Sequence, residues 1–157
     1  MKLTIFRISL LIGLIGIMVF PQCRQIPKPA SDTHDIVVYF SRSEPTEIVQ
    51  VAVDRTVEKT DDIASTAIRE LLKGPTESEK AQGLTTAIAN GTVLNYIRIE
   101  NGVATVDFNE RFDFQMGGSA RVTAIRGQIE KTLFQFPGIL EVVITINFGE
   151  RPAVLEP

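Results

Sequence analysis

The sequence predicts an α/β domain of the α+β kind, a two-layer sandwich with one small mixed sheet and two helices on one face. Three observations support this prediction. Several short runs alternate apolar and polar residues, two longer runs repeat apolar residues at helical spacing, and these elements follow the order β-β-α-β-β-α-β. Because the strands are apolar on one side only, the second face of the sheet is expected to be polar and exposed.

The N-terminus carries the pattern of a secretory signal peptide, which we predict over residues 1–22. Lys2 and Arg7 precede a run from Ile8 to Phe20 that is apolar apart from Ser9. The run is about 13 residues long, shorter than the roughly 20 residues that a membrane-spanning helix needs. A basic segment before a short apolar run is typical of an export signal, with an uncleaved signal anchor as the alternative.

Cys23 follows this apolar run and is the only cysteine. A single thiol cannot form an intramolecular disulfide, so its presence in an exported protein needs another explanation. Lipidation of Cys23, as in bacterial lipoproteins, supplies one and predicts a membrane anchor in the bacterial cell envelope. The preceding residues Phe20, Pro21 and Gln22 depart from the usual Leu, small residue and Gly or Ala, and Gln22 is large for its position.

Residues 23–35 are predicted to form a flexible tether between this lipidated cysteine and the folded domain. The segment from Arg24 to Asp35 holds two prolines and several small polar residues. The only histidine, His34, falls in it and is expected to be solvated, since nothing there fixes partners for catalysis. The folded domain is predicted over residues 36–157.

The domain begins with a predicted hairpin, followed by a helix. Strand-forming runs at Ile36–Phe40 and Ile48–Val53 flank turn residues. The helix then starts at Thr60, Asp61 and Asp62, whose side chains can cap it, and ends at Gly74 and Pro75. Its apolar stripe consists of Ala64, Ile68, Leu71 and Leu72.

A second hairpin is predicted around the dipeptide Asn101-Gly102, which favours a type I′ turn. This turn sets the pairing of Val93–Ile99 with Val103–Phe108. On one face Ile99 lies opposite Ala104, Ile97 opposite Val106 and Asn95 opposite Phe108. On the polar face Arg98 lies opposite Thr105 and Tyr96 opposite Asp107, so Tyr96, Arg98 and Asp107 are a candidate contact surface.

The last two elements are a helix capped by Ser119 and a strand at Ile139–Phe148. The helix ends at Pro137 and Gly138, and its apolar face consists of Val122, Ile125, Ile129, Leu133 and Phe136. The strand alternates, so one face is expected to carry Leu140, Val142, Ile144, Ile146 and Phe148. A polar tail with two prolines follows.

No catalytic, metal or cofactor site is predicted. His34 and Cys23 both precede the folded part, which excludes a Ser-His-Asp or Cys-His arrangement within it. The folded part holds no cluster of His and Cys for zinc. The net charge of −3 argues against a nucleic-acid-binding protein.

Three weaker patterns each have a simpler explanation that we favour. Asp107, Glu110 and Asp113 could bind Ca²⁺ or act as an acid/base pair, but Arg111 among them favours solvated carboxylates. Two glycines within Met116–Arg121 could form an anion-binding loop, yet no Lys follows, so a loop and helix cap is favoured. The mixed charges at Glu77–Lys80 indicate a solvated connection.

These elements together resemble the GerMN domain, a sporulation and spore germination domain, from about Ile36 to the C-terminus. The family pattern joins a helix ending in Leu-Leu-x-Gly-Pro, a Gly-Leu, a Gly-Thr before a strand, a hairpin glycine and a Thr-Leu-x-x-Phe-Pro helix end. Its positions here are Leu71, Leu72, Gly74, Pro75, Gly83, Leu84, Gly91, Thr92, Gly102, Thr132, Leu133, Phe136 and Pro137. Ala89 departs from the Pro that the family often has in this loop.

The resemblance implies a non-catalytic, membrane-tethered envelope protein, an assembly module whose domain is similar to the ring-building folds of sporulation complexes. Such domains contact copies of themselves or other proteins, and some relatives carry two copies where this chain has room for one. A module that binds cell-wall glycan or a small ligand is the alternative. A hydrolase using Asp107 and Glu110 is the least favoured reading, because the sequence orients no pair of groups.

Overall fold

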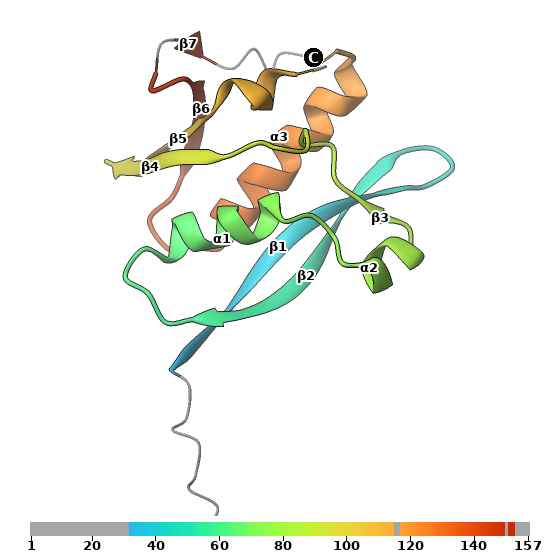
Figure 1. Cartoon of the computed structure of the whole chain (residues 1–157), viewed down its shortest axis with the longest axis horizontal. Coiled ribbons are helices and arrows are strands. Elements are labelled where there is room, and N and C mark those ends of the chain that lie inside the picture. The colour runs from blue at the N-terminus through green and yellow to red at the C-terminus, as the bar shows by residue number, and fades with distance from the viewer. Residues whose placement is uncertain (1–31, 115–116, 150, 153–157) are drawn as a thin grey trace, which may run out of the picture. The chain divides into compact units, whose positions relative to one another are not determined.

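The computed structural model describes residues 32–114, 117–149 and 151–152, so Cys23 and the predicted signal peptide lie outside the described residues. Strands and helices interleave along the chain, which confirms the predicted α/β class (Figure 1). In the described part, no helix is both long enough and apolar enough to cross a membrane.

The strands divide between two sheets rather than forming one. The first sheet has the order β2-β1-β3 and is antiparallel; its strands are β1 (Thr33–Ser43), β2 (Ile48–Glu58) and β3 (Leu84–Thr85). The second has the order β4-β5-β6-β7; its strands are β4 (Leu94–Glu100), β5 (Val103–Phe108), β6 (Glu141–Ile146) and β7 (Arg151–Pro152). Because β5 and β6 are parallel while the other pairs are antiparallel, this second sheet is mixed, as predicted.

β1 is the central strand of the first sheet, with partners along both of its edges. Along one edge it pairs with β2 from Thr33 to Ser43. Along the other edge, β3 pairs with Ser41 and Arg42, and the side chains of Thr132 and Gln135 bond to the backbone of Tyr39 and Val37. β1 also begins before residue 36, so His34, expected in the tether, is part of this strand.

Side chains from the last helix and its C-terminal end replace a neighbouring strand along this edge of β1. The Gln135 amide accepts a hydrogen bond from the Val37 backbone N–H at 2.8 Å and donates one to the Val37 carbonyl at 2.7 Å. The Thr132 hydroxyl accepts a bond from the Tyr39 N–H at 3.2 Å. These contacts pair groups that a buried strand edge would otherwise leave unsatisfied.

The first predicted helix is confirmed as α1 (Ile63–Leu72). The Asp62 side chain accepts a hydrogen bond from the Ser65 N–H, and Gly74, at φ 75°, follows the last turn. α1 contacts β1, β4 and the last helix, α3 (Ser119–Leu133), and so links the two sheets (Figure 1).

At the start of α3 the cap position belongs to Gly118, with no side-chain hydrogen bond, so the predicted Ser119 cap is wrong.

The core lies where the apolar faces of the two sheets and both long helices meet. Phe108 stacks on Phe112 of the short 3₁₀ helix η1 (Glu110–Asp113), with ring centroids 4.5 Å apart. The largest fully buried side chains are Phe40, Phe108, Phe112, Ile68, Leu71, Ile125, Ile129, Leu133 and Ile146.

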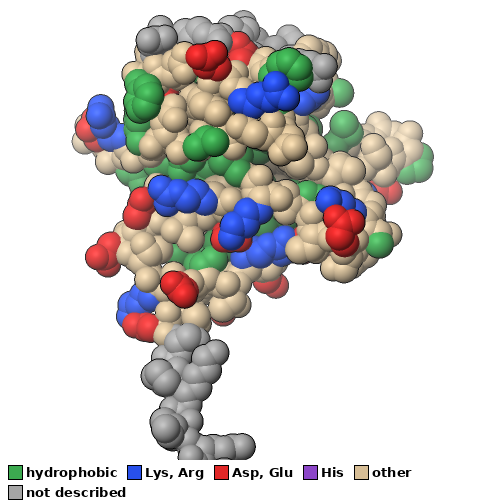
Figure 2. All heavy atoms as spheres, viewed as in Figure 1, with side chains coloured by type: hydrophobic (Ala, Val, Ile, Leu, Met, Phe, Trp, Pro, Cys, Tyr) green, Lys and Arg blue, Asp and Glu red, His purple; other side chains and the backbone are tan. Residues whose placement is uncertain are grey.

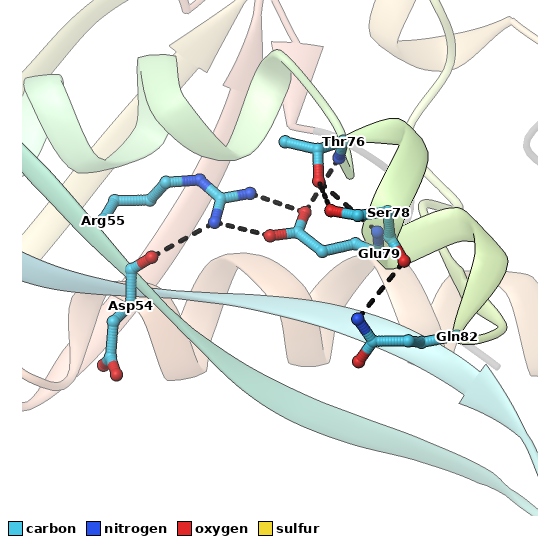
Figure 3. A network of polar contacts seen from close by, with 6 residues as sticks. All are labelled: Asp54, Arg55, Thr76, Ser78, Glu79 and Gln82. Carbon is cyan, nitrogen blue, oxygen red and sulfur yellow. Dashed lines mark hydrogen bonds and ion pairs between the residues drawn. The ribbon is translucent and has the colours of Figure 1, made fainter.

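A short helix that the sequence reading missed, α2 (Glu77–Ala81), occupies the predicted solvated connection. Thr76 and Glu79 form a capping box at its start. The Glu79 carboxylate also receives two hydrogen bonds of 2.7 Å from the guanidinium of Arg55 in β2 (Figure 3). Both side chains are largely buried, so Glu79 is an anchor for α2 rather than a solvated acid.

Candidate interaction surface

The hairpin of β4 and β5 orients the predicted contact residues, and most of its predicted register is confirmed. Asn101 (φ 52°) and Gly102 (φ 84°) both have positive φ, as a type I′ turn requires. Tyr96 pairs with Asp107 and Arg98 with Thr105. The exception is Asn95, which lies in a bulge, so that Leu94 rather than Asn95 pairs with Phe108.

Adding β6 extends these pairs into rows across the outer face of the second sheet. Arg98, Thr105 and Val143 form one row, and Tyr96, Asp107 and Thr145 form the next. The opposite face carries Ala104, Val106, Phe108, Val142, Ile144 and Ile146, all buried in the core. The outer face is therefore the side of this sheet on which charged and polar side chains can reach a partner.

Tyr96 and Arg98 lie on this outer face, as predicted. The Arg98 guanidinium carbon is 5.7 Å from the centroid of the Tyr96 ring, within the range of a cation–π contact. The Arg98 side chain is 66% exposed, and its contact with Glu100 is long, at 3.9 Å. A partner can therefore replace the weak Glu100 contact at little cost.

Asp107 does not belong to the exposed surface, so its predicted place there is wrong. Its side chain is fully buried. The carboxylate accepts bonds from the Asn95 amide (2.7 Å), the Thr145 hydroxyl (2.6 Å) and the backbone N–H groups of Phe148 and Gly149 (2.9 Å each). The turn after β6 folds over the outer face at this point and covers the carboxylate.

These contacts keep Asp107 ionised despite its burial. Burial by itself raises the pKa of a carboxyl group, because the charged form loses its hydration. The bonds from Thr145, Asn95, Phe148 and Gly149 favour the charged form more strongly, and the pKa of Asp107 lies below its ordinary value. A carboxylate whose oxygens are already occupied by four donors is a structural element of the turn and is poorly suited to take a proton from a substrate.

Exposed apolar side chains surround the end of this hairpin. Leu140 is 81% exposed beside Gly102, Ile99 is 49% exposed at the end of β4, and Val143 is 36% exposed on the outer face. The sequence pattern placed Leu140 and Phe148 with the buried residues of the last strand. Both are exposed, because β6 spans only Glu141–Ile146 and the chain turns at positive φ immediately after it.

The structure does not gather the three acids into a metal site. Glu110 and Asp113 lie in η1, and no group of three His, Cys, Asp or Glu residues that could hold a metal ion occurs in the described ranges. A hollow of about 650 Å³ beside η1 is lined by Asn109, Glu110, Arg111, Asp113, Phe114 and Asn147. Charges of both signs are interspersed over the face of the domain that Figure 2 shows, without a broad basic patch.

The family profile described as "Germane: Sporulation and spore germination" matches residues 37–149, from within β1 to the turn that follows β6. The chain belongs to this family. The predicted GerMN resemblance is thereby confirmed, and the outer face of the second sheet is a surface of the GerMN domain. Among curated proteins, none matches the chain.

Solved structures of GerMN domains have the same fold. The chain is similar to the tandem GerMN domains of the sporulation protein GerM from Bacillus subtilis, with 25% identity, a TM-score of 0.64 and 78% of this chain covered. It spans 42% of that tandem structure. It is also similar to the first GerMN domain of the same protein, with 23% identity, a TM-score of 0.57, and coverage of 73% of this chain and 83% of that domain's chain.

Proposed function

We propose that this chain is a non-catalytic assembly module of the bacterial cell envelope, in which the GerMN domain binds other proteins, in sporulation or spore germination. The observation that carries the proposal is the outer face of the second sheet, where Arg98 and Tyr96 lie near the exposed apolar side chain of Val143. Arg and Tyr are enriched at protein interfaces, and an apolar neighbour adds area that a partner can bury.

The family supports a role in sporulation or germination, and GerM, whose tandem domains the chain resembles, is a sporulation protein. We find no pair of side chains oriented for catalysis among the described residues. The nearest candidate, Asp107, is enclosed by its four hydrogen-bond donors. We therefore assign binding rather than catalysis to the domain.

Photo-crosslinking at position 98 tests the binding surface. A photoreactive phenylalanine analogue replaces Arg98 in the full chain, expressed in the envelope of its native bacterium. The matched control places the same analogue at Lys73, whose side chain is 68% exposed after the end of α1. We expect a discrete protein adduct at position 98 and none at position 73. Equal adducts at both positions, or no adduct at position 98, would contradict the proposal.

We further propose that a lipid on Cys23 anchors the module to the membrane. The order of apolar run, single cysteine and proline-containing tether supports this proposal. Metabolic labelling with an alkyne analogue of palmitate tests it. The wild-type chain is expected to take up the label and Cys23→Ala to lose it; label retained by Cys23→Ala, or absent from the wild type, would contradict lipidation at Cys23.

One observation favours the alternative, a module that binds cell-wall glycan. The hollow beside η1 combines amide and carboxylate side chains with Phe114, which is 47% exposed. Arg111, however, lies 3.8 Å from the centroid of the Phe114 ring and occupies a face on which a sugar could stack. Sedimentation with purified peptidoglycan distinguishes the two functions. If the domain binds glycan, the wild-type chain sediments with the peptidoglycan and the Phe114→Ala variant does not. If it is an assembly module, the wild-type chain stays in solution.

A further inference from the structure

A groove runs between the start of α3 and the end of the β1–β2 hairpin, which projects past α3 in Figure 1. It consists of two hollows of about 420 and 440 Å³. They share Ile48 of β2 and Ala120 and Ala124 of α3, so the two hollows adjoin one another along α3. We call it the α3 groove. It shares no residue with the surface around Tyr96 and Arg98.

The α3 groove is positively charged, although the chain as a whole is acidic. Among the described residues that line it, the charged ones are Arg121 in one hollow and Lys131 in the other. Seven basic side chains of the described domain have an acidic partner: Arg42, Arg55, Lys59, Lys73, Lys80, Arg98 and Arg126. Arg121 and Lys131 form no ion pair within the described ranges, and the first turn of α3 contains no acidic residue. The groove thus holds two cations that lack counter-charges.

Small side chains give the α3 groove its depth. Gly127 lies directly under Gln50, where an added Cβ would approach the Gln50 Cγ to 3.3 Å. Gln50 donates to the Ser41 hydroxyl (3.1 Å) and to the Ala124 carbonyl (3.4 Å), so it is held down against α3. Hydroxyl groups of Ser43 and Thr85 line the other hollow. Ile48, 43% exposed, lies where the two hollows meet.

From this arrangement we infer that the α3 groove binds an extended acidic segment of a partner protein. Two unpaired cations are complementary to two carboxylates, and Ile48 offers an apolar contact between them. A concave groove cannot contact a bilayer surface along its floor. No described residue that lines either hollow is an aromatic one on which a sugar ring could stack. A peptide therefore fits better than an anionic membrane or a glycan.

The positions of the two basic residues on α3 indicate the motif. The Cα atoms of Arg121 and Lys131 are separated by about 15 Å along the helix axis, from a rise of about 1.5 Å per residue. An extended peptide rises by about 3.4 Å per residue, so acidic residues four positions apart span about 14 Å and lie on one side of the strand. The preferred segment carries two acidic residues at positions i and i+4.

Fluorescence anisotropy with the full chain in non-ionic detergent tests this inference. The probe is a labelled eight-residue Thr/Val peptide with Glu at positions 2 and 6. Two control peptides have Gln at these positions or Glu at positions 2 and 3. The first peptide is expected to bind at least about tenfold more tightly than the Gln peptide, a difference of about 1.4 kcal/mol. It is also expected to bind more tightly than the peptide with adjacent acids, and more weakly as salt increases.

Lys131→Gln is the simpler variant. The Lys131 side chain makes no hydrogen bond within the described domain, and its ammonium lies 5.9 Å from the centroid of the Tyr39 ring, at the outer limit of a cation–π contact. The Arg121 guanidinium, by contrast, donates to the Ala87 carbonyl at 3.1 Å. We expect Lys131→Gln and Arg121→Gln each to weaken binding by roughly threefold to fivefold, as for exposed charge pairs. The matched control is Arg69→Gln, which removes an exposed cation of α1 that has no ion pair in the described ranges, and should leave binding unchanged.

Three results would overturn the inference. The first is that the Gln peptide, or the peptide with adjacent acids, binds as tightly as the peptide with Glu at positions 2 and 6. The second is that Arg69→Gln weakens binding as much as Lys131→Gln does. The third is that phosphatidylglycerol nanodiscs bind through Arg121 and Lys131 while the Glu peptide does not bind. Crosslinking at position 98 is independent of all three, so the failure of either proposal is recognisable separately.

Discussion

The backbone N–H of Phe148 donates a 2.9 Å hydrogen bond to the buried carboxylate of Asp107, in a turn where Phe148 has φ 59°. Asn147 (φ 55°) and Gly149 (φ 81°) are also left-handed. Two consecutive non-glycine residues in this region are unfavourable, by about 1–3 kcal/mol each. The carboxylate of Asp107 accepts the hydrogen bonds that hold this turn in place, and the turn covers the carboxylate.

Replacing Asp107 should therefore destabilise the domain. Asp107→Asn keeps the shape of the side chain but replaces one acceptor oxygen with an NH₂ group. That group then faces the backbone N–H of Phe148 or Gly149, with which it cannot form a hydrogen bond. We expect a loss of about 1–3 kcal/mol in the free energy of unfolding, the usual cost of an unsatisfied buried group. Urea unfolding of the full chain measures it. Glu110→Gln, an exposed change in η1, should have little effect; equal losses would contradict the structural role of Asp107.

The Arg55–Glu79 pair predicts how stability depends on pH. The Arg55 guanidinium lowers the pKa of Glu79 from 4.5 to about 2. Because the pKa is lower in the folded state, this stabilisation is present above about pH 4.5 and is lost as the pH falls towards 2. In that window, Glu79→Gln should lose less stability with acid than the wild type does.

Unfolding midpoints between pH 5 and pH 2 check this difference. The pKa of Asp107 is also lowered, so this residue contributes to the acid sensitivity of the wild type and of Glu79→Gln alike. Its contribution therefore cancels when the two proteins are compared. Glu77→Gln is the matched control in the same helix, because the Glu77 side chain is 91% exposed. A Glu79→Gln curve parallel to the wild-type curve would show that the ion pair does not contribute.

Gln135 is predicted to protect the edge of β1. Gln135→Ala removes both partners of the Val37 backbone, so we expect a loss of about 1–3 kcal/mol in stability and faster hydrogen exchange at the Val37 amide. Exchange measured by NMR distinguishes this local effect from general destabilisation. Gln82→Ala, which removes only an exposed bond to the Ser78 carbonyl, should leave the Val37 amide unchanged.

Gly102 is predicted to be required at the tip of the second hairpin. It has φ 84°, and an added Cβ would lie 3.2 Å from the Leu140 Cδ1. Gly102→Ala should cost about 1 kcal/mol or more in thermal unfolding, because L residues avoid this conformation. Gly117→Ala is the control, since an added Cβ there meets nothing within 4 Å and its φ is not positive. A Gly102→Ala variant as stable as the wild type would argue against the type I′ turn.

Local patterns in the sequence predicted much of the fold because they depend on neighbouring residues. The spacing of Ala64, Ile68 and Leu71 predicted α1, and Asn101-Gly102 predicted the hairpin register except at the Asn95 bulge. The ends of elements were less predictable. Leu140 and Phe148 continue the apolar alternation of β6, yet the backbone leaves the strand before Phe148, and no local pattern marks that point.

By itself, the sequence determined the class of the fold, its two long helices, its hairpins and its family. Tertiary structure decided which faces are free. Val37 and Gln135 are 98 positions apart, and their bonds cover part of an edge of β1 with which no strand of the second sheet pairs. Gly149, 42 positions after Asp107, covers a carboxylate that alternation alone assigns to solvent. Periodicity specifies the side of a strand to which a residue points, but distant backbone determines whether that side meets water.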